Sequence, residues 1–123
     1  MALPVLVVED HSINQEVAVL QLKSLGLISV VVSDGTAAVE AVRGAQFSLI
    51  LMDVMIPVMD GCEATRKIRE LELDTGKRTP IVAVSASSSA DIRMRCSLAG
   101  VDDYLDKPYN RAALKAVVDR WIP

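Results

Sequence analysis

Residues 49–61 read LILMDVMIPVMDG, and this stretch indicates both the fold and the place where chemistry occurs. It begins with four consecutive apolar residues, 49–52, which is typical of a strand that is buried on both faces. An aspartate, Asp53, follows at once. Burying a carboxylate is costly unless another group offsets its charge. The position of Asp53 at the tip of a buried strand therefore suggests a special role for this residue.

Four other short apolar runs recur along the chain, with room for a helix between each pair. They cover residues 5–8, 28–32, 81–84 and, more weakly, 103–105. Continuous apolar runs are typical of strands that are covered on both faces, whereas alternating runs are typical of half-exposed strands. Five alternations of strand and helix predict an α/β sandwich with a parallel sheet and right-handed crossovers.

The helices between these runs are predicted from their caps and apolar stripes. The first is expected to follow Ser12, with Gln15 completing a capping box, and to stop at Gly26. Three apolar residues form one stripe along it: Ile13, Val17 and Leu20. The other helices are expected over residues 36–43, from residue 60 to about 71, over 89–99 and from 110 to 121. Polar residues 72–79 are predicted to form a solvated loop.

The composition argues against several classes of function. A net charge of −3 and a pI of about 5.1 argue against nucleic-acid binding, as does an aromatic content of 3%. No apolar run approaches the ~20 residues that span a bilayer, and no secretory signal pattern opens the chain. We therefore expect one cytoplasmic domain over residues 1–123, without membrane contact of its own.

The two cysteines, Cys62 and Cys96, have no metal-binding spacing. Together with the chain's one histidine they cannot complete a zinc site. Cysteines in an apolar intracellular domain are usually small buried hydrophobic residues, and we expect that role for both of them.

Polar residues follow four of the five predicted strands: Glu9, Asp10, Asp53, Ser85 and Lys107. Each of them alone has an ordinary structural explanation, such as capping a helix. Ligands of an open parallel sheet bind outside the carboxyl ends of its strands, so these side chains are expected to meet. Their carboxylates should raise one another's pKa unless a cation joins them.

The chemistry of this group points to phosphate and a hard cation. Carboxylate and carbonyl oxygens suit Mg²⁺, which often bridges to a phosphate. Lys107 would add a positive charge for an anionic group, and Ser85 a hydroxyl donor. A carboxylate can itself act as the nucleophile and form an aspartyl phosphate. This chemistry would explain why a rigid strand presents Asp53.

Along its full length the chain resembles the receiver domain of two-component response regulators. The resemblance depends on four segments in the order and spacing of that family: VVED (7–10), LMDVMIPVMDG (51–61), AVSA (83–86) and YLDKP (104–108). It implies a flavodoxin-like (βα)5 fold with a five-stranded parallel sheet of order 2-1-3-4-5. The segments INQEVA (13–18) and MDVMIPVMDGCEATRKIR (52–69) are most similar to receivers of hybrid sensor histidine kinases.

The resemblance assigns the metal site and the phosphorylation site to particular residues. Asp53 matches the aspartate that accepts the phosphoryl group. Glu9 and Asp10 match the acidic pair of the Mg²⁺ site, with Asp10 the nearer match to the metal ligand. The backbone carbonyl of Met55 matches the third protein ligand of the metal.

Three further residues match the groups that sense the phosphoryl group. Ser85 takes the place of the Thr or Ser that holds a phosphoryl oxygen in the family, and Lys107 takes the place of the family's lysine. Tyr104 occupies the position of an aromatic switch residue. The resemblance therefore implies a signalling switch that changes the face of its fourth helix, fifth strand and fifth helix.

Three residues depart from the pattern of hybrid-kinase receivers. His11 replaces a common Asn, Met55 a common Gln and Ile56 a common Met. None of these changes removes a ligand or the acceptor, but side chains there can orient or exclude the attacking water. The departures therefore bear on the lifetime of the phosphoryl group.

The implied partner is a phosphohistidine donor, either a histidine kinase or a phosphotransfer domain. The chain is expected to be a monomer or a weak dimer and not to turn over a substrate by itself, although a hybrid parent would be a kinase. The sequence leaves open a free-standing regulator. A phosphatase or transferase that uses an aspartyl phosphate is disfavoured because Met55 stands where those enzymes need a second acid. A binding module that is never phosphorylated is disfavoured by the complete set of site residues.

Overall fold

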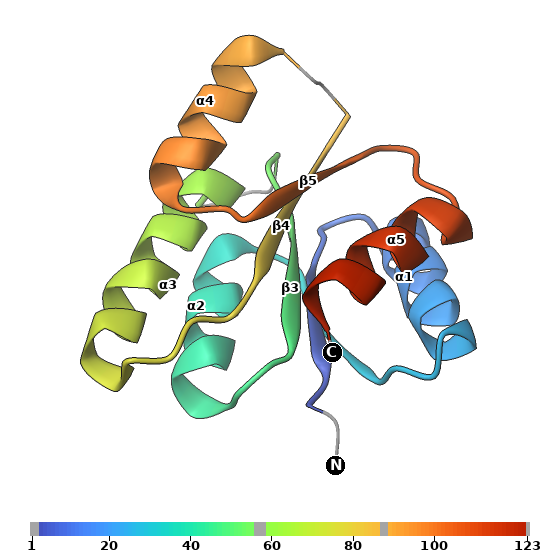
Figure 1. Cartoon of the computed structure of the whole chain (residues 1–123), viewed down its shortest axis with the longest axis horizontal. Helices are drawn as coiled ribbons and strands as arrows, with labels where there is room; N and C mark the ends of the chain where they lie inside the picture. Colours follow the sequence, from blue (N-terminus) through green and yellow to red (C-terminus); the bar gives the residue numbers. More distant parts are fainter. Residues whose placement is uncertain (1–2, 56–58, 87–88, 123) are drawn as a thin grey trace.

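The structure is a computed structural model, and it describes residues 3–55, 59–86 and 89–122. Strands and helices alternate strictly along these residues (Figure 1). The strands are β1 (Val5–Val8), β2 (Ser29–Val32), β3 (Leu49–Asp53), β4 (Ile81–Ser85) and β5 (Asp103–Asp106). The helices are α1 (Ser12–Ser24), α2 (Gly35–Gly44), α3 (Gly61–Thr75), α4 (Ala90–Ala99) and α5 (Arg111–Trp121). Among the described residues, no helix combines the length and the apolar character needed to cross a membrane.

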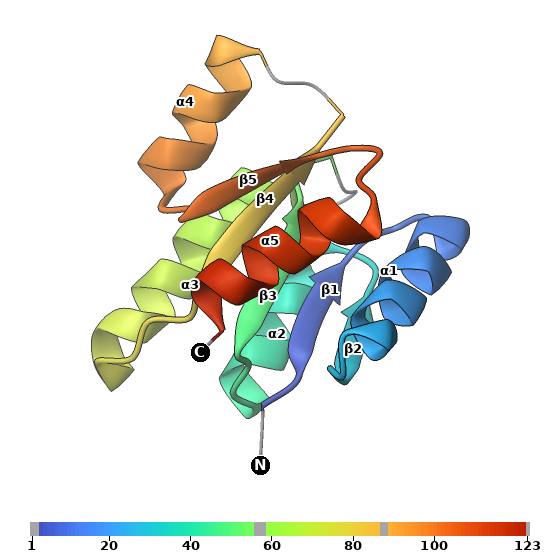
Figure 2. The ribbon, with the colours of Figure 1, turned by 45° about the vertical axis from the view of Figure 1, so that its right-hand side comes forward.

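The strands form one parallel sheet of order β2-β1-β3-β4-β5, which confirms the predicted topology. Because all strands run the same way, their carboxyl ends meet at one edge (Figure 2). The order of the strands switches between β1 and β3: β2 lies on one side of β1, and β3, β4 and β5 follow one another on the other side. A ligand site is expected at such a switch point. Val8 pairs in register with Met52, so the residues that follow them, Glu9 and Asp53, emerge side by side.

The fold has three layers, with helices on both faces of the central sheet (Figure 1). One apolar core joins α1 and α5 to the sheet, and a second joins α2 and α3 to its other face. The inner strands β1, β3 and β4 are buried throughout, as the continuous apolar runs predict. A small third cluster lies under α4 and contains Val54, Cys62, Ala83, Cys96 and Ala99. Full burial of one large aliphatic side chain stabilises a fold by about 1.5–3 kcal/mol, so the two large cores dominate stability.

The first helix differs from the prediction at its start and in its buried face. His11 is the N-cap residue and makes no side-chain cap hydrogen bond, so the capping box predicted at Ser12 is wrong. Gln15 instead donates through Nε2 to the Glu9 carbonyl at 2.6 Å. The buried face of α1 consists of Ala18 and Leu22, and the stripe of Ile13, Val17 and Leu20 faces solvent. The helix carries two apolar stripes, and spacing alone does not tell which one is buried.

The predicted loop over residues 72–79 is also wrong in part, because α3 continues to Thr75. Its Glu72 is largely buried and pairs with Arg69 at 2.6 Å. The same Arg69 binds Asp102 at 2.7 Å. These ion pairs link the last turns of α3 to the residue that precedes β5. The first part of segment 72–79 is therefore an ordered end of a helix and not a solvated loop.

A glycine at the start of α3 allows that helix to pack against the end of β3. A Cβ atom on Gly61 would lie 2.4 Å from the Asp53 carbonyl oxygen and 2.9 Å from the Val54 Cα. The Gly61 amide donates to the Val54 carbonyl at 3.0 Å. The close approach therefore fixes the backbone that presents Asp53.

We predict that Gly61→Ala lowers the free energy of unfolding by about 1–3 kcal/mol, because the added methyl group forces the two backbones apart. The matched control is Gly44→Ala, at the end of α2, where an added Cβ meets nothing within 4 Å. That substitution should be neutral or should stabilise the domain by up to about 1 kcal/mol. Urea unfolding measures both changes, and equal effects in the two variants would contradict the packing argument.

Candidate functional site

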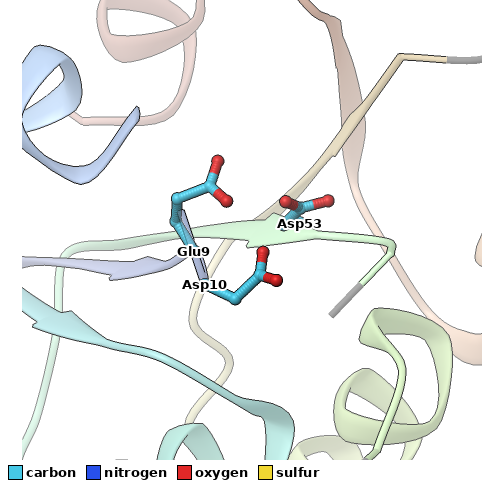
Figure 3. A group of neighbouring side chains, drawn as sticks. All are labelled: Glu9, Asp10 and Asp53. Carbon is cyan, nitrogen blue, oxygen red and sulfur yellow. The ribbon is translucent and has the colours of Figure 1, made fainter. Parts of the chain in front are cut away.

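Three carboxylates converge at the carboxyl edge of the sheet, as Figure 3 shows. Glu9 and Asp10 follow β1, and Asp53 ends β3. One oxygen from each of them lies within 4.8 Å of the others. The side chains of Glu9 and Asp53 are buried, with residues 6% and 5% exposed, and Asp10 is exposed. A set of oxygen donors that is open on one side fits a hard divalent cation such as Mg²⁺.

The ammonium group of Lys107 bridges the two buried acids. Its Nζ donates to Glu9 Oε1 at 2.6 Å and to Asp53 Oδ2 at 2.7 Å. Lys107 follows β5, and its amide donates to the Ser85 carbonyl at 2.8 Å, which holds the lysine backbone against the end of β4. The structure therefore brings four predicted site residues together from β1, β3, β4 and β5.

The environment shifts the pKa values of the two buried carboxylates, Asp53 and Glu9, in opposite directions. Burial raises the pKa of Asp53 from 3.8 to about 6, against the opposing effects of the Lys107 ammonium and the Met55 amide. Burial also acts to raise the pKa of Glu9, but Lys107 and the His11 amide more than offset it, so that pKa lies below its ordinary value. The pKa of Lys107 is raised: burial lowers it, but its contacts with both acids have the larger effect.

The expectation that the acids raise one another's pKa is therefore wrong for Glu9, whose pKa is lowered. For Asp53 the direction is right, but burial and not charge repulsion is the chief cause. Lys107 is the chief reason for the Glu9 result, because its ammonium group supplies positive charge beside that carboxylate. The sequence placed this lysine at the rim but did not show that it would contact both acids at once.

Met55 and His11 both lie next to a carboxylate of the site. The Met55 amide donates to Asp53 Oδ1 at 3.0 Å, and its side chain is 71% exposed. His11 donates its own amide to Glu9 Oε2 at 3.2 Å. Met55 and His11 therefore each bind a site carboxylate through the backbone amide and not through the side chain. The third departure from the family pattern, Ile56, lies outside the described residues.

Ser85 and Tyr104 lie on the same face of the sheet. Ala83 pairs in register with Tyr104, and Ser85 follows two residues later on β4. Side chains alternate along a strand, so Ser85 and Tyr104 both point toward α4. The Tyr104 hydroxyl donates to the Arg93 carbonyl at 2.8 Å and also contacts the Ser97 hydroxyl. The Arg93 guanidinium lies 4.6 Å from the centre of the tyrosine ring.

A shallow cleft of about 250 Å³ opens beside the acids between α1 and the β5–α5 connection. Its lining includes Glu9, Asn14, Val17, Lys107 and Tyr109. The middle residue of the exposed apolar stripe of α1, Val17, lines this cleft, so the cleft and the stripe adjoin each other. The sequence prediction missed this surface because it gave those residues no role outside the helix pattern.

The sequence and the structure match those of known receiver domains. Residues 5–119 match the family model of the response regulator receiver domain. The chain is 40% identical over 118 residues to the hybrid signal transduction protein dokA of Dictyostelium discoideum; the match covers 96% of this chain but 7% of dokA.

Two solved structures are also similar. One is the receiver domain of a sensor histidine kinase from Pseudomonas aeruginosa, with a magnesium ion coordinated in its active-site cleft; it is 41% identical, with a TM-score of 0.89 and 98% of each chain covered. The other is a Saccharomyces cerevisiae receiver domain in complex with a histidine phosphotransfer protein. That receiver is 34% identical, with a TM-score of 0.90, and the match covers 98% of this chain and 88% of that one.

We predict that the raised pKa of Asp53 makes the metal-free domain less stable as the pH rises. Between 3.8 and about 6 the folded state holds a proton that the unfolded state has lost, so stability is greatest below this window and falls through it. Asp53→Asn lacks this titration. Its free energy of unfolding relative to the unsubstituted chain should grow by up to about 3 kcal/mol from about pH 4 to about pH 7.

Urea unfolding in EDTA across this range tests the prediction. Because Glu9 is present in both proteins, taking their difference removes most of its own titration. A difference that does not change with pH would contradict the raised pKa.

Proposed function

The chain belongs to the response regulator receiver domain family, and we propose on that premise that Asp53 accepts a phosphoryl group from a phosphohistidine. The observation that carries the proposal is the pair of short contacts from Lys107 to Glu9 and Asp53. They gather a buried nucleophile, a second acid and a cationic group in one cluster. A merely structural aspartate at a strand end would not need such a set.

Each residue of the site has a separate role in the transfer of the phosphoryl group. A carboxylate oxygen of Asp53 forms a bond to phosphorus as the bond from phosphorus to the donor imidazole nitrogen breaks. With a pKa of about 6, Asp53 is mostly ionised at neutral pH and so is ready to attack. Lys107 already contacts this carboxylate at 2.7 Å and is placed to neutralise the phosphoryl oxygens that arrive. The Met55 amide holds the other carboxylate oxygen, which fixes the direction of attack.

Mg²⁺ would be held by Asp10 and Asp53, with Glu9 beside them and the backbone carbonyl of Met55 as a further ligand. The cluster of carboxylate oxygens within 4.8 Å supports the choice of a hard cation. When bound, Mg²⁺ would supply positive charge to the acids and to the phosphoryl oxygens. Asp10 suits this role because it is the exposed member of the cluster and faces the open side.

The partner that fits the surface is a helical phosphotransfer domain or histidine kinase. A phosphohistidine must come within bonding distance of Asp53, so the rest of its domain must rest on the rim. The exposed stripe of α1 offers an apolar surface there: Ile13 and Leu20 are both 66% exposed and Val17 is 44% exposed. An amphipathic helix is the partner that usually covers a stripe with this spacing.

A hybrid sensor histidine kinase is the parent protein that we favour. The relative from Dictyostelium discoideum is itself a hybrid signal transduction protein and is far longer than this chain. Such an origin would place the domain on the cytoplasmic side of a membrane sensor. A free-standing regulator is the alternative, and the sequence that flanks this domain in its gene would distinguish the two.

The output follows from the link between Ser85 and Tyr104. A phosphoryl group on Asp53 would accept a hydrogen bond from the Ser85 hydroxyl and draw it toward the rim. Space would then open on the α4 side of β4, into which the Tyr104 ring could turn. That turn would break its contacts with Arg93 and Ser97, so α4 would be released from β5. Phosphorylation would act by favouring one of two existing states.

We predict that Asp53→Asn abolishes labelling by acetyl phosphate in Mg²⁺, because the amide cannot form the acyl phosphate. Intact-mass analysis measures the acid-labile phosphate on the protein. Asp74→Asn, near the end of α3 and remote from the rim, is the matched control and should label normally. Undiminished labelling of the Asp53 variant would overturn the assignment of the acceptor.

We also predict that Leu20→Lys slows transfer from a phosphohistidine domain at least about tenfold, because a charge in an apolar interface is costly to desolvate. Acetyl phosphate needs no docking surface and should label the variant at the normal rate. Leu73→Lys, at a still more exposed position of α3, is the control and should accept phosphate from both donors. Equal slowing with both donors would place the fault in the site and not in docking.

Finally, Ser85→Ala should still accept phosphate but should lose the response of α4. Amide NMR of α4 reports this coupling as phosphorylation-induced shifts that are strongly reduced relative to the unsubstituted chain. Ser48→Ala, at the opposite end of the sheet, removes a hydroxyl without touching the site and should keep the full response. Full-sized shifts in the Ser85 variant would exclude the proposed link.

A further inference from the structure

The two cysteines, which are 34 residues apart in the sequence, meet in the small cluster under α4. Cys62 lies in the first turn of α3 and Cys96 in the second half of α4. Their sulfur atoms are 3.2 Å apart, and the residues are 3% and 1% exposed. The two thiols therefore touch each other in a dry contact between two helices.

This contact is a principal link between α4 and the rest of the domain. Among the described residues of α4, Cys96 and Ala99 are buried, and both have small side chains. Ile92 of α4 is partly buried and packs against the same cluster. Polar contacts add to it: Arg95 pairs with Asp60 at 2.9 Å at an exposed site, and the Arg93 carbonyl accepts from Tyr104. Little apolar area holds α4 in place, so this helix is expected to open more readily than its neighbours.

Cys62, by contrast, sits on a fixed part of the structure. It follows Gly61, whose backbone is pressed against the end of β3. Asp60, the N-cap of α3, accepts from the Glu63 amide at 2.9 Å and fixes the same turn. One sulfur is thus anchored to the backbone that presents Asp53, and the other belongs to the loosely held helix.

We propose that Cys62 and Cys96 form a reversible intrachain disulfide that fastens α4 to α3. A disulfide has its sulfur atoms ~2.05 Å apart, so the two must approach by about 1 Å from their present contact of 3.2 Å. A side-chain rotation together with a small shift of α4 provides a movement of that size. The pair is therefore a modification site.

A hydroperoxide is the oxidant class that suits this pair. One thiol, as its thiolate, attacks a peroxide oxygen; the O–O bond breaks, an alcohol or water leaves, and the sulfur becomes a sulfenic acid. The second thiol then attacks that sulfur, forming the S–S bond and releasing water. Overall the two thiols lose two electrons and two protons, and the peroxide is reduced. A dithiol reverses the reaction by exchange.

Burial governs when this reaction occurs. It raises the pKa of Cys96 to about 12, so this thiol stays protonated while α4 is packed. A peroxide reaches the sulfurs only when α4 moves away, and the return of the helix brings the second thiol onto the oxidised one. Oxidation therefore follows the opening of α4 and ends it by locking the helix down.

The consequence for signalling depends on the proposed phosphorylation of Asp53. Neither cysteine contacts the acids or Lys107 through a described hydrogen bond or ion pair, so the oxidised domain should still accept phosphate. Its α4, however, cannot leave α3 and should no longer respond. The disulfide would thus separate acceptance of the phosphoryl group from output.

The experiment treats the full 123-residue chain with hydrogen peroxide, blocks free thiols by alkylation and measures intact mass and a peptide map. The matched control is the double variant Cys96→Ser, Leu98→Cys. It moves the thiol to a position that is 83% exposed on α4, so this thiol is more accessible and no longer occupies the buried position beside Cys62. Hydrogen exchange of α4 amides is then compared before oxidation, after oxidation and after addition of dithiothreitol.

We expect a monomer that has lost two hydrogen atoms, with a crosslinked peptide joining the two cysteines, and α4 exchange that slows at least about tenfold and recovers with dithiothreitol. The control should give sulfenic acid or dimers and no intrachain link. If the unsubstituted chain gives separate sulfinic acids, or stays reduced while the control is oxidised, the proposal is overturned. Asp53→Asn should form the disulfide normally, so failure of the phosphorylation proposal would not be mistaken for failure of this one.

Discussion

The bridge from the Lys107 ammonium to Glu9 and Asp53 is the interaction on which the site depends. Two carboxylates at the ends of adjacent strands would repel each other and resist burial. The lysine lies within 2.7 Å of both and makes their burial tolerable, while Asp53 keeps a pKa of about 6. The sheet order makes this bridge possible, because β3 and β4 lie between β1 and β5 and all their ends open on one edge. The charged cluster at the rim therefore depends on the strand order of the parallel sheet.

Most of the fold was predictable from the sequence because its signals agree with one another. Continuous apolar runs marked the inner strands, and three helices begin beside residues 60, 89 and 110, where the pattern placed their starts; Asp60, Ser89 and Asn110 are the N-caps there. The start of α1 was not predictable in the same way. Its chain offers two apolar stripes, and only the packing of α5 and the sheet selects Ala18 and Leu22 for burial. The extent of α3 was missed because its last turn is polar and is held by ion pairs, which a hydropathy pattern does not show.

In the site, too, the residue types were predictable from the sequence, whereas properties that depend on contacts between distant residues were not. The residue types were enough to place Asp53, Glu9, Asp10, Ser85 and Lys107 on one rim, because each one follows a strand. The pKa of Glu9 was not deducible, since it depends on a contact of 2.6 Å with a residue 98 positions away. The contact between Cys62 and Cys96 was equally hidden, because it depends on how α3 and α4 lie against each other.

The helices of the domain are held with unequal strength, and this inequality bears on how the domain could signal. The cores under α1, α2, α3 and α5 contain many large aliphatic side chains, whereas α4 is held by two small buried residues, one partly buried isoleucine and a few polar contacts. A single new hydrogen bond at the rim is worth only about 1.5–3 kcal/mol even when a charged group takes part. Such an energy is too small to disturb the large cores, but it is comparable with what holds α4. A response confined to α4 and β5 therefore follows from how apolar burial is distributed over the fold.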